Sequence, residues 1–380
     1  MKILHVITSL YKNGGGTSEV VPRLCRALKE GGESITIATH WAKEISDTAK
    51  DAIRAGVTYE GTSKRDRWVP HFIERSLGYS LDFHRILPKL VSESDLVHVH
   101  CLWQLAGWKA AKEAQKQGKP YVVMPHGFLE PERLKSSKWK KRIMGAIIDR
   151  PMLNHAASVI ATSESEAEGI RRYGVKRPIH IMPIGLDMEN YKVSACKGKT
   201  LLYFSRITPI KGLDMLANVW GQIDRNDWKL LIVGPDDRGY TDEMKRLFAK
   251  TCPKESYEFK DPVFGEEKFK LLSSVDAFIL PTRSENWSIA VAEAMVSGLP
   301  VVCTKGAPWS CLNEVNAGWW VDISENGLQQ GLSDMMKLTS GERVAYGKRG
   351  REWCRRHLSW ERIAEDMRTC YLRCIQERNG

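Results

Sequence analysis

The sequence predicts an α/β protein with two successive domains, each built around a parallel β-sheet. Short runs rich in aliphatic and β-branched residues alternate with segments of helical periodicity along the chain, which is typical of parallel sheets covered by helices on both faces. This alternation is interrupted once, by a polar run at residues 192–199, and then begins again. A length of 380 residues is sufficient for two domains with separate hydrophobic cores.

Six strands are expected in the first half of the chain, namely Ile3–Thr8, Ser34–Thr39, Leu96–His100, Tyr121–Pro125, Ser158–Ala161 and His180–Met182. Two helices between them have clear ends, because Ser18–Glu30 and Ser163–Tyr173 are each followed by glycine. At the start of the second of these helices, Ser163 and Glu166 match a capping box.

The stretch Pro183–Asp187 leads into the polar run around Lys192–Lys199, and we interpret this run as the linker between the domains. The second half is expected to contain strands Leu201–Ser205, Lys229–Val233, Ala277–Leu280 and Val301–Thr304, with helices Gly212–Gln222 and Ile289–Ser297. The chain ends in an amphipathic helix near Trp360–Gln376. We therefore expect domains at 1–190 and 191–358 and a C-terminal helix at 359–380.

Composition is that of a globular enzyme, with 42% hydrophobic and 27% charged residues. No apolar run approaches the roughly 20 residues of a membrane-spanning helix, and the first seven residues resemble a core strand more than a signal peptide, so a cytoplasmic protein is expected. The nine cysteines form no CxxC pair, which predicts reduced, buried thiols. A net charge of +11 predicts an anionic partner: nucleic acid, an acidic membrane surface or a phosphorylated small molecule.

The strongest chemical motif lies at residues 281–302, where a buried strand, a polar loop and a helix of small residues follow one another. Ser288 is the expected N-cap of that helix, and the first amides of such a helix can bind phosphate. Glu285 and Glu293 lie eight residues apart, and each carboxylate can accept two hydroxyl hydrogen bonds. Spacing alone would favour two solvated glutamates, whereas the strand–loop–helix context favours a polyol-binding site.

Two further candidate anion-binding segments follow expected strands. Arg206 and Lys211 lie in the loop between a strand and a helix, where the alternative is two ordinary surface cations. Gly15 and Gly16 belong to a glycine loop after the first strand, which can form a nest of amides for an anion or serve as a plain turn. It is not the dinucleotide fingerprint, because Glu19 occupies the position of the last glycine.

His126 stands in a Pro-His-Gly sequence at the carboxyl end of a strand, the edge at which α/β sheets bind ligands. A single histidine is more often structural, but this position favours a role in a site. His98 and His100 alternate in another expected strand and resemble a metal-binding pair. Since no acidic cluster accompanies them, we favour packing and expect no metal site.

Together these motifs resemble those of the glycosyltransferases of family 4, which are retaining enzymes with the GT-B fold. The resemblance extends over nearly the whole chain and is most specific in the second half, where Glu285 and Glu293 match the family's E-x7-E motif. It implies two Rossmann-like domains that face a cleft, with the last helix returning to the first domain. The chain departs from the family at Asn286, Trp287 and Ser288, where Gly-Phe-Gly is usual, so that the sugar pocket is expected to differ.

The resemblance also implies roles for individual residues. Glu285 would meet the donor sugar, Glu293 the nucleotide ribose, and His126 the donor sugar near its anomeric carbon. Arg206 and Lys211 would hold the donor diphosphate and stabilise the charge that grows on the leaving group. The remaining expected diphosphate contacts are Gly15, Gly16, Ser288 and Ile289, and the expected sugar-pocket residues are Asn286 and Trp287. The segment Phe259–Gly265 would contact the base.

The implied reaction transfers a sugar from a nucleotide diphosphate sugar to a hydroxyl of a glycan or lipid-linked acceptor, with retention, in the synthesis of a surface, capsular or exopolysaccharide. With no evident enzymic nucleophile, a front-face substitution fits, in which the leaving phosphate helps to deprotonate the acceptor. The sequence contains no D-x-D motif, so neither a metal nor another cofactor is expected.

Two alternatives remain at this stage: a sugar-nucleotide epimerase or hydrolase of the same fold, and a noncatalytic basic protein that binds nucleic acid or membrane. The linked motifs argue against the second, and no nucleic-acid-binding module is evident, so no nucleic-acid partner is expected. The basic segment Glu132–Ile148 contains Lys138, Trp139, Lys140 and Lys141. It can face the acceptor or an anionic membrane, as on the cytoplasmic face of the inner membrane, or it can be a solvated face whose apolar stripe packs in the core.

Overall fold

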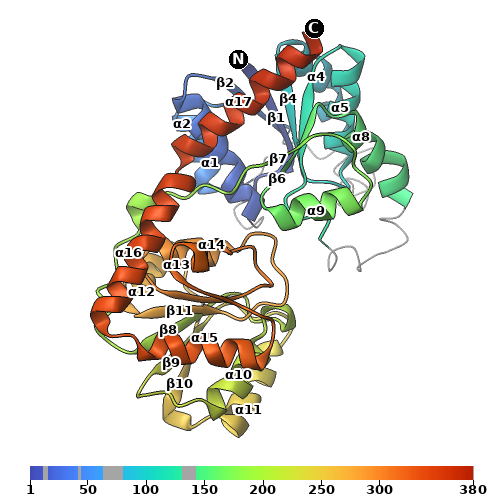
Figure 1. The fold of residues 1–380 in the computed structure, drawn as a ribbon. Coiled ribbons are helices and arrows are strands. Elements are labelled where there is room, and N and C mark those ends of the chain that lie inside the picture. Colours follow the sequence, from blue (N-terminus) through green and yellow to red (C-terminus); the bar gives the residue numbers. More distant parts are fainter. Residues whose placement is uncertain (12–15, 42–43, 63–79, 131–142, 380) are drawn as a thin grey trace. The chain divides into compact units, whose positions relative to one another are not determined.

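The computed structural model describes residues 1–11, 16–41, 44–62, 80–130 and 143–379 (Figure 1). The chain divides into two compact units, Met1–Gly185 with Trp360–Gly380 and Leu186–Ser359. The division falls after Gly185, five residues before the predicted boundary at position 190. The last helix, which is α17 (Trp360–Asn379), belongs to the first unit, where it contacts α1 (Gly16–Glu30).

The first unit contains a seven-stranded parallel sheet with the strand order β3-β2-β1-β4-β5-β6-β7. Its strands are β1 (Lys2–Ser9), β2 (Ser34–Trp41), β3 (Thr58–Gly61), β4 (Leu96–His100), β5 (Tyr121–Met124), β6 (Ser158–Ala161) and β7 (Ile179–Ile181). The order reverses beside β1, as it does in Rossmann folds. Six of these strands are the expected ones, and β3 is an addition.

The remaining described helices of this unit are α2 (Asp47–Arg54), α4 (Leu81–Ser92), α5 (Leu105–Lys116), the π-helical turn η1 (Gly145–Asp149), α8 (Arg150–His155) and α9 (Glu164–Arg172). One face of the sheet carries Val97 and Val99, which join a core cluster with Phe83 of α4 and Ala110 of α5. Because side chains alternate along a strand, the opposite face carries His98 and His100. That second face packs against α17, whose Tyr371 bonds His98.

The second unit contains a six-stranded parallel sheet with the order β10-β9-β8-β11-β12-β13. Its strands are β8 (Thr200–Phe204), β9 (Lys229–Val233), β10 (Tyr257–Lys260), β11 (Ala277–Leu280), β12 (Val301–Thr304) and β13 (Gly318–Val321). Its helices of four or more residues are α10 (Leu213–Gln222), α11 (Tyr240–Thr251), α12 (Glu266–Ser274), α13 (Ile289–Val296), α14 (Cys311–Glu314), α15 (Glu325–Lys337) and α16 (Ser340–His357). Two parallel sheets in one chain confirm the predicted α/β class.

Two further sequence expectations can be compared with the structure. All nine cysteines are free and buried, as the absence of a CxxC pair predicts. Among the described residues, no helix combines the length and the hydropathy that a membrane span requires.

Candidate active site

The first part of the candidate site lies at the carboxyl edge of the second sheet, between β8 and β11. Strand β8 pairs with β9 on one side and with β11 on the other, so the strand order reverses at this point. Ligands of open α/β sheets bind outside the carboxyl ends of the strands at such a reversal. The loops that follow β8 and β11 contain the residues expected to bind the donor.

These two loops are tied together by backbone and side-chain contacts. The Arg283 amide donates to the Ile210 carbonyl at 2.8 Å, and the Arg283 guanidinium donates twice to the Asp214 carboxylate at 2.7 Å. Gly212 has a φ of +68°, and a Cβ there would lie 2.0 Å from the Pro281 carbonyl oxygen. Glycine is therefore required where the loops approach each other.

Lys211 and Glu285 meet across this junction as an ion pair. Their side chains are only 15% and 18% exposed, so the pair is largely withdrawn from water. The Glu285 amide donates to the Gly306 carbonyl at 2.7 Å, which attaches the loop after β11 to the loop after β12. The structure thus brings a residue predicted to bind the donor diphosphate, Lys211, into direct contact with a residue predicted to bind the donor sugar, Glu285.

Arg206 differs from Lys211 in its surroundings. It lies two residues after the end of β8 and is exposed, and its guanidinium has no ion-pair partner in the described part of the chain. One of the two predicted cations is therefore available to an anion as the chain stands. The other is already neutralised by Glu285.

Glu293 lies in α13 and is the most buried of the predicted site residues, with a side chain 7% exposed. Its Oε1 atom accepts hydrogen bonds from the Tyr191 hydroxyl at 2.8 Å and from Lys268 Nζ at 2.5 Å. Neither partner was predicted from the sequence. Because both bonds go to one oxygen, Oε2 keeps acceptor capacity for a further hydroxyl.

The residues that replace the family's Gly-Phe-Gly are partly packed into the second unit. Trp287 is buried, its ring lies 4.7 Å from that of Trp309, and its carbonyl accepts a bond from Trp309 Nε1 at 2.6 Å. Asn286 is half-buried, and Ile289 is the first residue of α13.

Ser288 lies at the expected N-cap position of α13, but the expected capping hydrogen bond is absent. Ser288 precedes α13 with a φ of +67° and a ψ of 82°, and its side chain makes no capping bond. An N-cap residue normally has an extended backbone, which aims its hydroxyl at the amides two or three residues ahead. The left-handed backbone of Ser288 does not provide this geometry.

A cavity of about 340 Å³ opens beside these loops, at the carboxyl edges of β9 and β10. Its lining includes Ile207, Gly234, Asp236, Phe259 and Pro262. It therefore adjoins the segment Phe259–Gly265 that is expected to contact the base.

In the first unit, His126 follows β5 in an unusual backbone conformation. His126 has a φ of +57° and Gly127 a φ of +73°, and a left-handed backbone at a non-glycine residue often marks a functional site. Burial lowers the pKa of His126 to about 4, so its imidazole is neutral at physiological pH. His126 Nε2 lies 3.0 Å from His100 Nδ1.

Glu166 holds this turn and was predicted only as part of a capping box. Its carboxylate accepts bonds from the Gly127 amide and, at 2.7 Å, from both the amide and the hydroxyl of Thr162. Only half of the capping box forms, because Ser163 Oγ accepts from the Glu166 amide at 3.1 Å while the carboxylate turns toward Gly127. Glu166 is 2% exposed.

The other predicted residues are less informative. Gly16 is the first residue of α1, whereas Gly15, Lys138, Trp139, Lys140 and Lys141 lie outside the described residues. At the end of the basic segment, Ile143 and Ile147 are 51% and 68% exposed. At these two positions, the apolar stripe lies on the surface and not in the core.

Comparison with known proteins decides the family. Residues 14–190 match the sequence model described as Glycosyltransferase Family 4, and residues 198–337 match the one described as Glycosyl transferases group 1. The chain belongs to glycosyltransferase family 4. It is similar to the GDP-mannose:cellobiosyl-diphosphopolyprenol alpha-mannosyltransferase of Xanthomonas campestris, with 22% identity over 89% of this chain and 87% of that protein. It is also similar to the D-inositol 3-phosphate glycosyltransferase of Nocardia farcinica, with 25% identity over 75% of this chain and 68% of that protein.

Solved structures support the same fold for this family 4 glycosyltransferase. HepE of Anabaena in complex with UDP matches with a TM-score of 0.75 at 16% identity, over 97% of this chain and 99% of that chain. The sucrose-phosphate synthase of Thermosynechococcus elongatus matches with a TM-score of 0.71 at 19% identity, over 99% and 100%. These likenesses confirm the predicted GT-B class with two Rossmann-like domains.

Proposed function

We propose that this family 4 glycosyltransferase moves a sugar from a nucleotide diphosphate sugar to a hydroxyl of a glycan or lipid-linked acceptor, with retention at the anomeric carbon. The observation that carries the proposal is the Lys211–Glu285 ion pair beside the exposed Arg206 at the strand reversal. Two cations for a diphosphate and one carboxylate for sugar hydroxyls occupy adjoining loops, as donor binding requires.

The donor class is supported by the names of similar proteins. HepE of Anabaena has been solved with UDP and with UDP-glucose, and the Xanthomonas campestris relative is named for GDP-mannose. The bases and sugars differ, whereas the nucleoside diphosphate is common to them. A diphosphate site is therefore the part of the proposal that these names support most directly.

Donor binding would rearrange the ion pair. A diphosphate carries more negative charge than one carboxylate, so it would compete with Glu285 for Lys211 and release the carboxylate to accept bonds from sugar hydroxyls. As the glycosidic bond breaks, negative charge grows on the leaving phosphate, and Arg206 and Lys211 stabilise that charge more than they stabilise the bound donor. In this proposal they act in place of a metal ion.

The other residues have proposed roles that match their surroundings. The free Oε2 of Glu293 would accept a bond from a ribose hydroxyl. His126 would bond a hydroxyl of the donor sugar as a neutral imidazole, because burial lowers its pKa to about 4. Retention would follow a front-face course, in which the leaving phosphate takes the acceptor proton and no enzymic nucleophile is needed.

The acceptor and the cellular setting form the last part of the proposal. The Xanthomonas relative is named for a diphosphopolyprenol-linked acceptor, which supports a lipid-linked acceptor and a role in surface polysaccharide synthesis. The exposed Ile143 and Ile147 follow a run of cations in sequence. An exposed apolar stripe beside basic residues suits the surface of an anionic membrane, which we place at the cytoplasmic face.

A thermal-shift panel tests the donor class. A ligand that binds only the folded state raises the melting temperature, so UDP or GDP and the matching nucleotide sugar should raise it, whereas the free sugar should not. If no nucleotide in the panel changes the melting temperature, the enzyme proposal is contradicted and a noncatalytic basic protein is favoured. A donor that is hydrolysed or epimerised equally fast with and without any glycan or lipid-linked acceptor would contradict the transferase proposal.

A further inference from the structure

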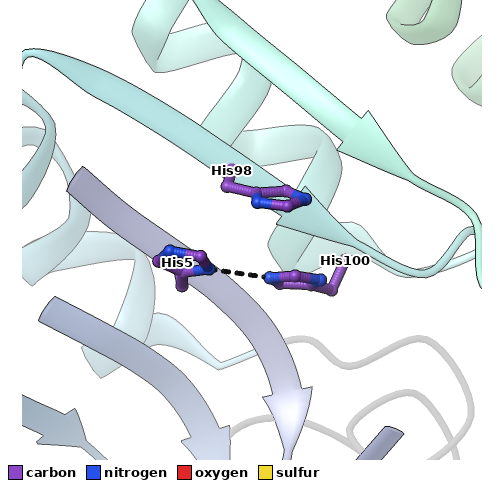
Figure 2. Close-up of side chains that lie close together, drawn as sticks. All are labelled: His5, His98 and His100. Carbon is purple, nitrogen blue, oxygen red and sulfur yellow. Dashed lines mark hydrogen bonds between the residues drawn. The ribbon is translucent and has the colours of Figure 1, made fainter. Parts of the chain in front are cut away.

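Three imidazoles lie together on the face of the first sheet that α17 covers (Figure 2). His5 in β1 is the register partner of His98 in β4, and His100 lies two residues farther along β4 on the same face. All three are at most 1% exposed. Figure 2 shows the rings of His5 and His100 joined by a hydrogen bond, with His98 beside them.

Two hydrogen bonds connect this cluster to the candidate site. His5 Nδ1 lies 3.0 Å from His100 Nε2, and His100 Nδ1 lies 3.0 Å from His126 Nε2. The second bond joins the buried strand β4 to the turn after β5. His5, His100 and His126 thus form a chain of hydrogen-bonded imidazoles. His98 is not part of this imidazole chain, because its Nδ1 bonds the Tyr371 hydroxyl at 2.6 Å.

Each ring in the chain is neutral at physiological pH. Burial lowers the pKa of His5 to about 3, that of His126 to about 4, and that of His100 well below its usual range. A neutral imidazole has one N–H and one lone pair, so His100 must donate in one bond and accept in the other.

This constraint leaves two proton arrangements. In the first, His5 Nδ1–H donates to His100, His100 Nδ1–H donates to His126, and the N–H of His126 is on Nδ1. In the second, every proton moves to the other nitrogen, and His126 donates through Nε2 to His100. The two arrangements differ at the buried end of the chain, where His5 Nε2 has no partner among the described residues.

The buried end favours the first arrangement. It leaves only a lone pair at His5 Nε2, whereas the second leaves an N–H donor without an acceptor. Buried N–H groups without acceptors are the rarer case in folded proteins. We propose that His100, supported by His5, is a positioning residue that holds His126 in the tautomer with its proton on Nδ1.

The consequence is that a neutral His126 presents an N–H donor at the edge of the sheet while its other nitrogen is occupied. Its backbone is fixed by the bond from Gly127 to Glu166, and its ring is fixed by His100. The inference rests on the role proposed for His126 only for its effect on catalysis. The tautomer itself is a property of the protein without any substrate.

The same three side chains also suggest a metal site, because ring nitrogens of His5, His98 and His100 lie within 4.8 Å of one another. A metal would need a lone pair from each ring, and both nitrogens of His100 already take part in hydrogen bonds, Nε2 with His5 and Nδ1 with His126. The hydrogen-bonded chain therefore accounts for the arrangement better, and metal content is measured as part of the test.

The test is two-bond nitrogen–proton NMR of the whole protein labelled with ¹⁵N-histidine, with His126 assigned from the signals lost in His126→Gln. The expected spectrum at pH 7.5 has a protonated Nδ1 and an unprotonated Nε2 for His126. In His100→Asn, the side-chain amide can still donate to His126, so the tautomer should persist. In His100→Leu it should become mixed. Tyr371→Phe removes the hydroxyl that bonds His98 but no hydrogen bond among His5, His100 and His126. It should therefore leave the His126 tautomer unchanged.

Turnover gives the second readout, with UDP-glucose and GDP-mannose as the donors offered and release of UDP or GDP as the signal. His100→Leu should lower kcat roughly ten- to a hundredfold, as loss of a residue that orients a metal-binding histidine does, with little change in KM. His100→Asn should recover most of the loss, and Tyr371→Phe should match the original protein.

An Nε2–H tautomer of His126 in the original protein would overturn the proposal, as would an unchanged Nδ1–H tautomer of His126 in His100→Leu. One tightly bound zinc per chain that is lost in His98→Asn would overturn it in favour of a metal site. If His126→Ala has full turnover while the tautomer results hold, the proposed role of His126 fails and the positioning of its ring stands.

Discussion

Lys211 and Glu285 form an ion pair between loops that follow two neighbouring strands of the second sheet, 74 residues apart in sequence. The pair is largely buried, and Arg206 lies exposed at the start of the same loop as Lys211. In the proposed mechanism, the donor diphosphate takes Lys211 from Glu285.

Replacement of either cation should reduce kcat more than it raises KM for the donor, because the interaction strengthens as charge grows on the leaving group. Arg206→Ala and Lys211→Ala should each cost roughly a hundred- to a thousandfold in kcat. Lys211→Arg should not restore kcat fully, since a planar guanidinium does not replace a compact ammonium. Lys337→Ala is the matched control, because Lys337 pairs with Asp334 on the surface of α15. Well-folded Arg206→Ala and Lys211→Ala proteins with an unchanged kcat would show that neither cation serves the reaction.

Substitution of the two glutamates should separate nucleotide binding from turnover. Glu293→Ala should weaken binding of the free nucleoside diphosphate, whereas Glu285→Ala, which frees Lys211 from its carboxylate, should not weaken that binding and should lower kcat. Isothermal calorimetry with UDP or GDP measures the first effect, and steady-state kinetics measures the second. Equal losses of nucleotide affinity in both variants would contradict the assignment.

Glu293→Ala should also destabilise the second unit. It leaves the Tyr191 hydroxyl and Lys268 Nζ without their acceptor, and an unsatisfied buried group costs about 1–3 kcal/mol. Glu293→Gln keeps an acceptor oxygen and should lose less. Urea denaturation of both variants distinguishes this structural effect from the loss of a ribose contact.

Glu166 should matter for activity although no substrate contact is proposed for it. Glu166→Ala leaves the buried Gly127 amide without its acceptor and should lower the free energy of unfolding by about 1–3 kcal/mol. It should lower kcat as well, since the turn that carries His126 loses its support. Glu168→Ala is the control on the same helix, because Glu168 is exposed and pairs with Arg172 on the surface. If both variants behave alike, Glu166 does not position His126.

The buried histidines should make the protein sensitive to mild acid. Burial lowers the pKa of His5 to about 3 and that of His126 to about 4, while in the unfolded chain both return to about 6.5. Below pH 6.5 the unfolded state therefore binds more protons than the folded state. The free energy of unfolding should thus be greatest above that pH and should decrease as the pH falls toward 4. Each of the two histidines should lower the free energy of unfolding by about 1.4 kcal/mol for each pH unit in that range.

Denaturant unfolding at pH 7.5, 6 and 5 measures this loss. His5→Phe should reduce its steepness, whereas His155→Gln, which replaces an exposed histidine, should leave it unchanged. A free energy of unfolding that is constant between pH 7.5 and pH 5 in the original protein would contradict the burial of neutral imidazoles.

The central strands were predictable from the sequence, and most edge strands were not. Strands β4, β6, β9, β11 and β12 have the bounds that the buried aliphatic runs predict. The three missed strands are β3, β10 and β13, and each lies at the edge of its sheet. An edge strand is only partly covered, so its sequence need not contain an apolar run, as in Thr58–Gly61 with its exposed and half-exposed residues.

The residues of the candidate site could also be predicted only in part from the sequence. Arg206, Lys211, Glu285 and Glu293 belong to short motifs that can be recognised along the chain. Their partners cannot be found in this way, since Tyr191 is 102 residues from Glu293, and Tyr371 is 273 residues from His98. Long-range pairs of this kind depend on which elements the fold brings together. The alternating His98 and His100, with His5 in the first strand, were the only local signal of the buried chain.

The most direct test of the account is proton NMR of the reaction in the presence of EDTA, with the donor that raises the melting temperature and a lipid-linked acceptor analogue. We expect that transfer continues in the chelator and that the first product formed has the anomeric configuration of the donor. A product with the inverted configuration would contradict the front-face reaction. Activity that disappears in EDTA and returns with Mg²⁺ or Mn²⁺ would contradict the proposal that Arg206 and Lys211 take the place of a metal.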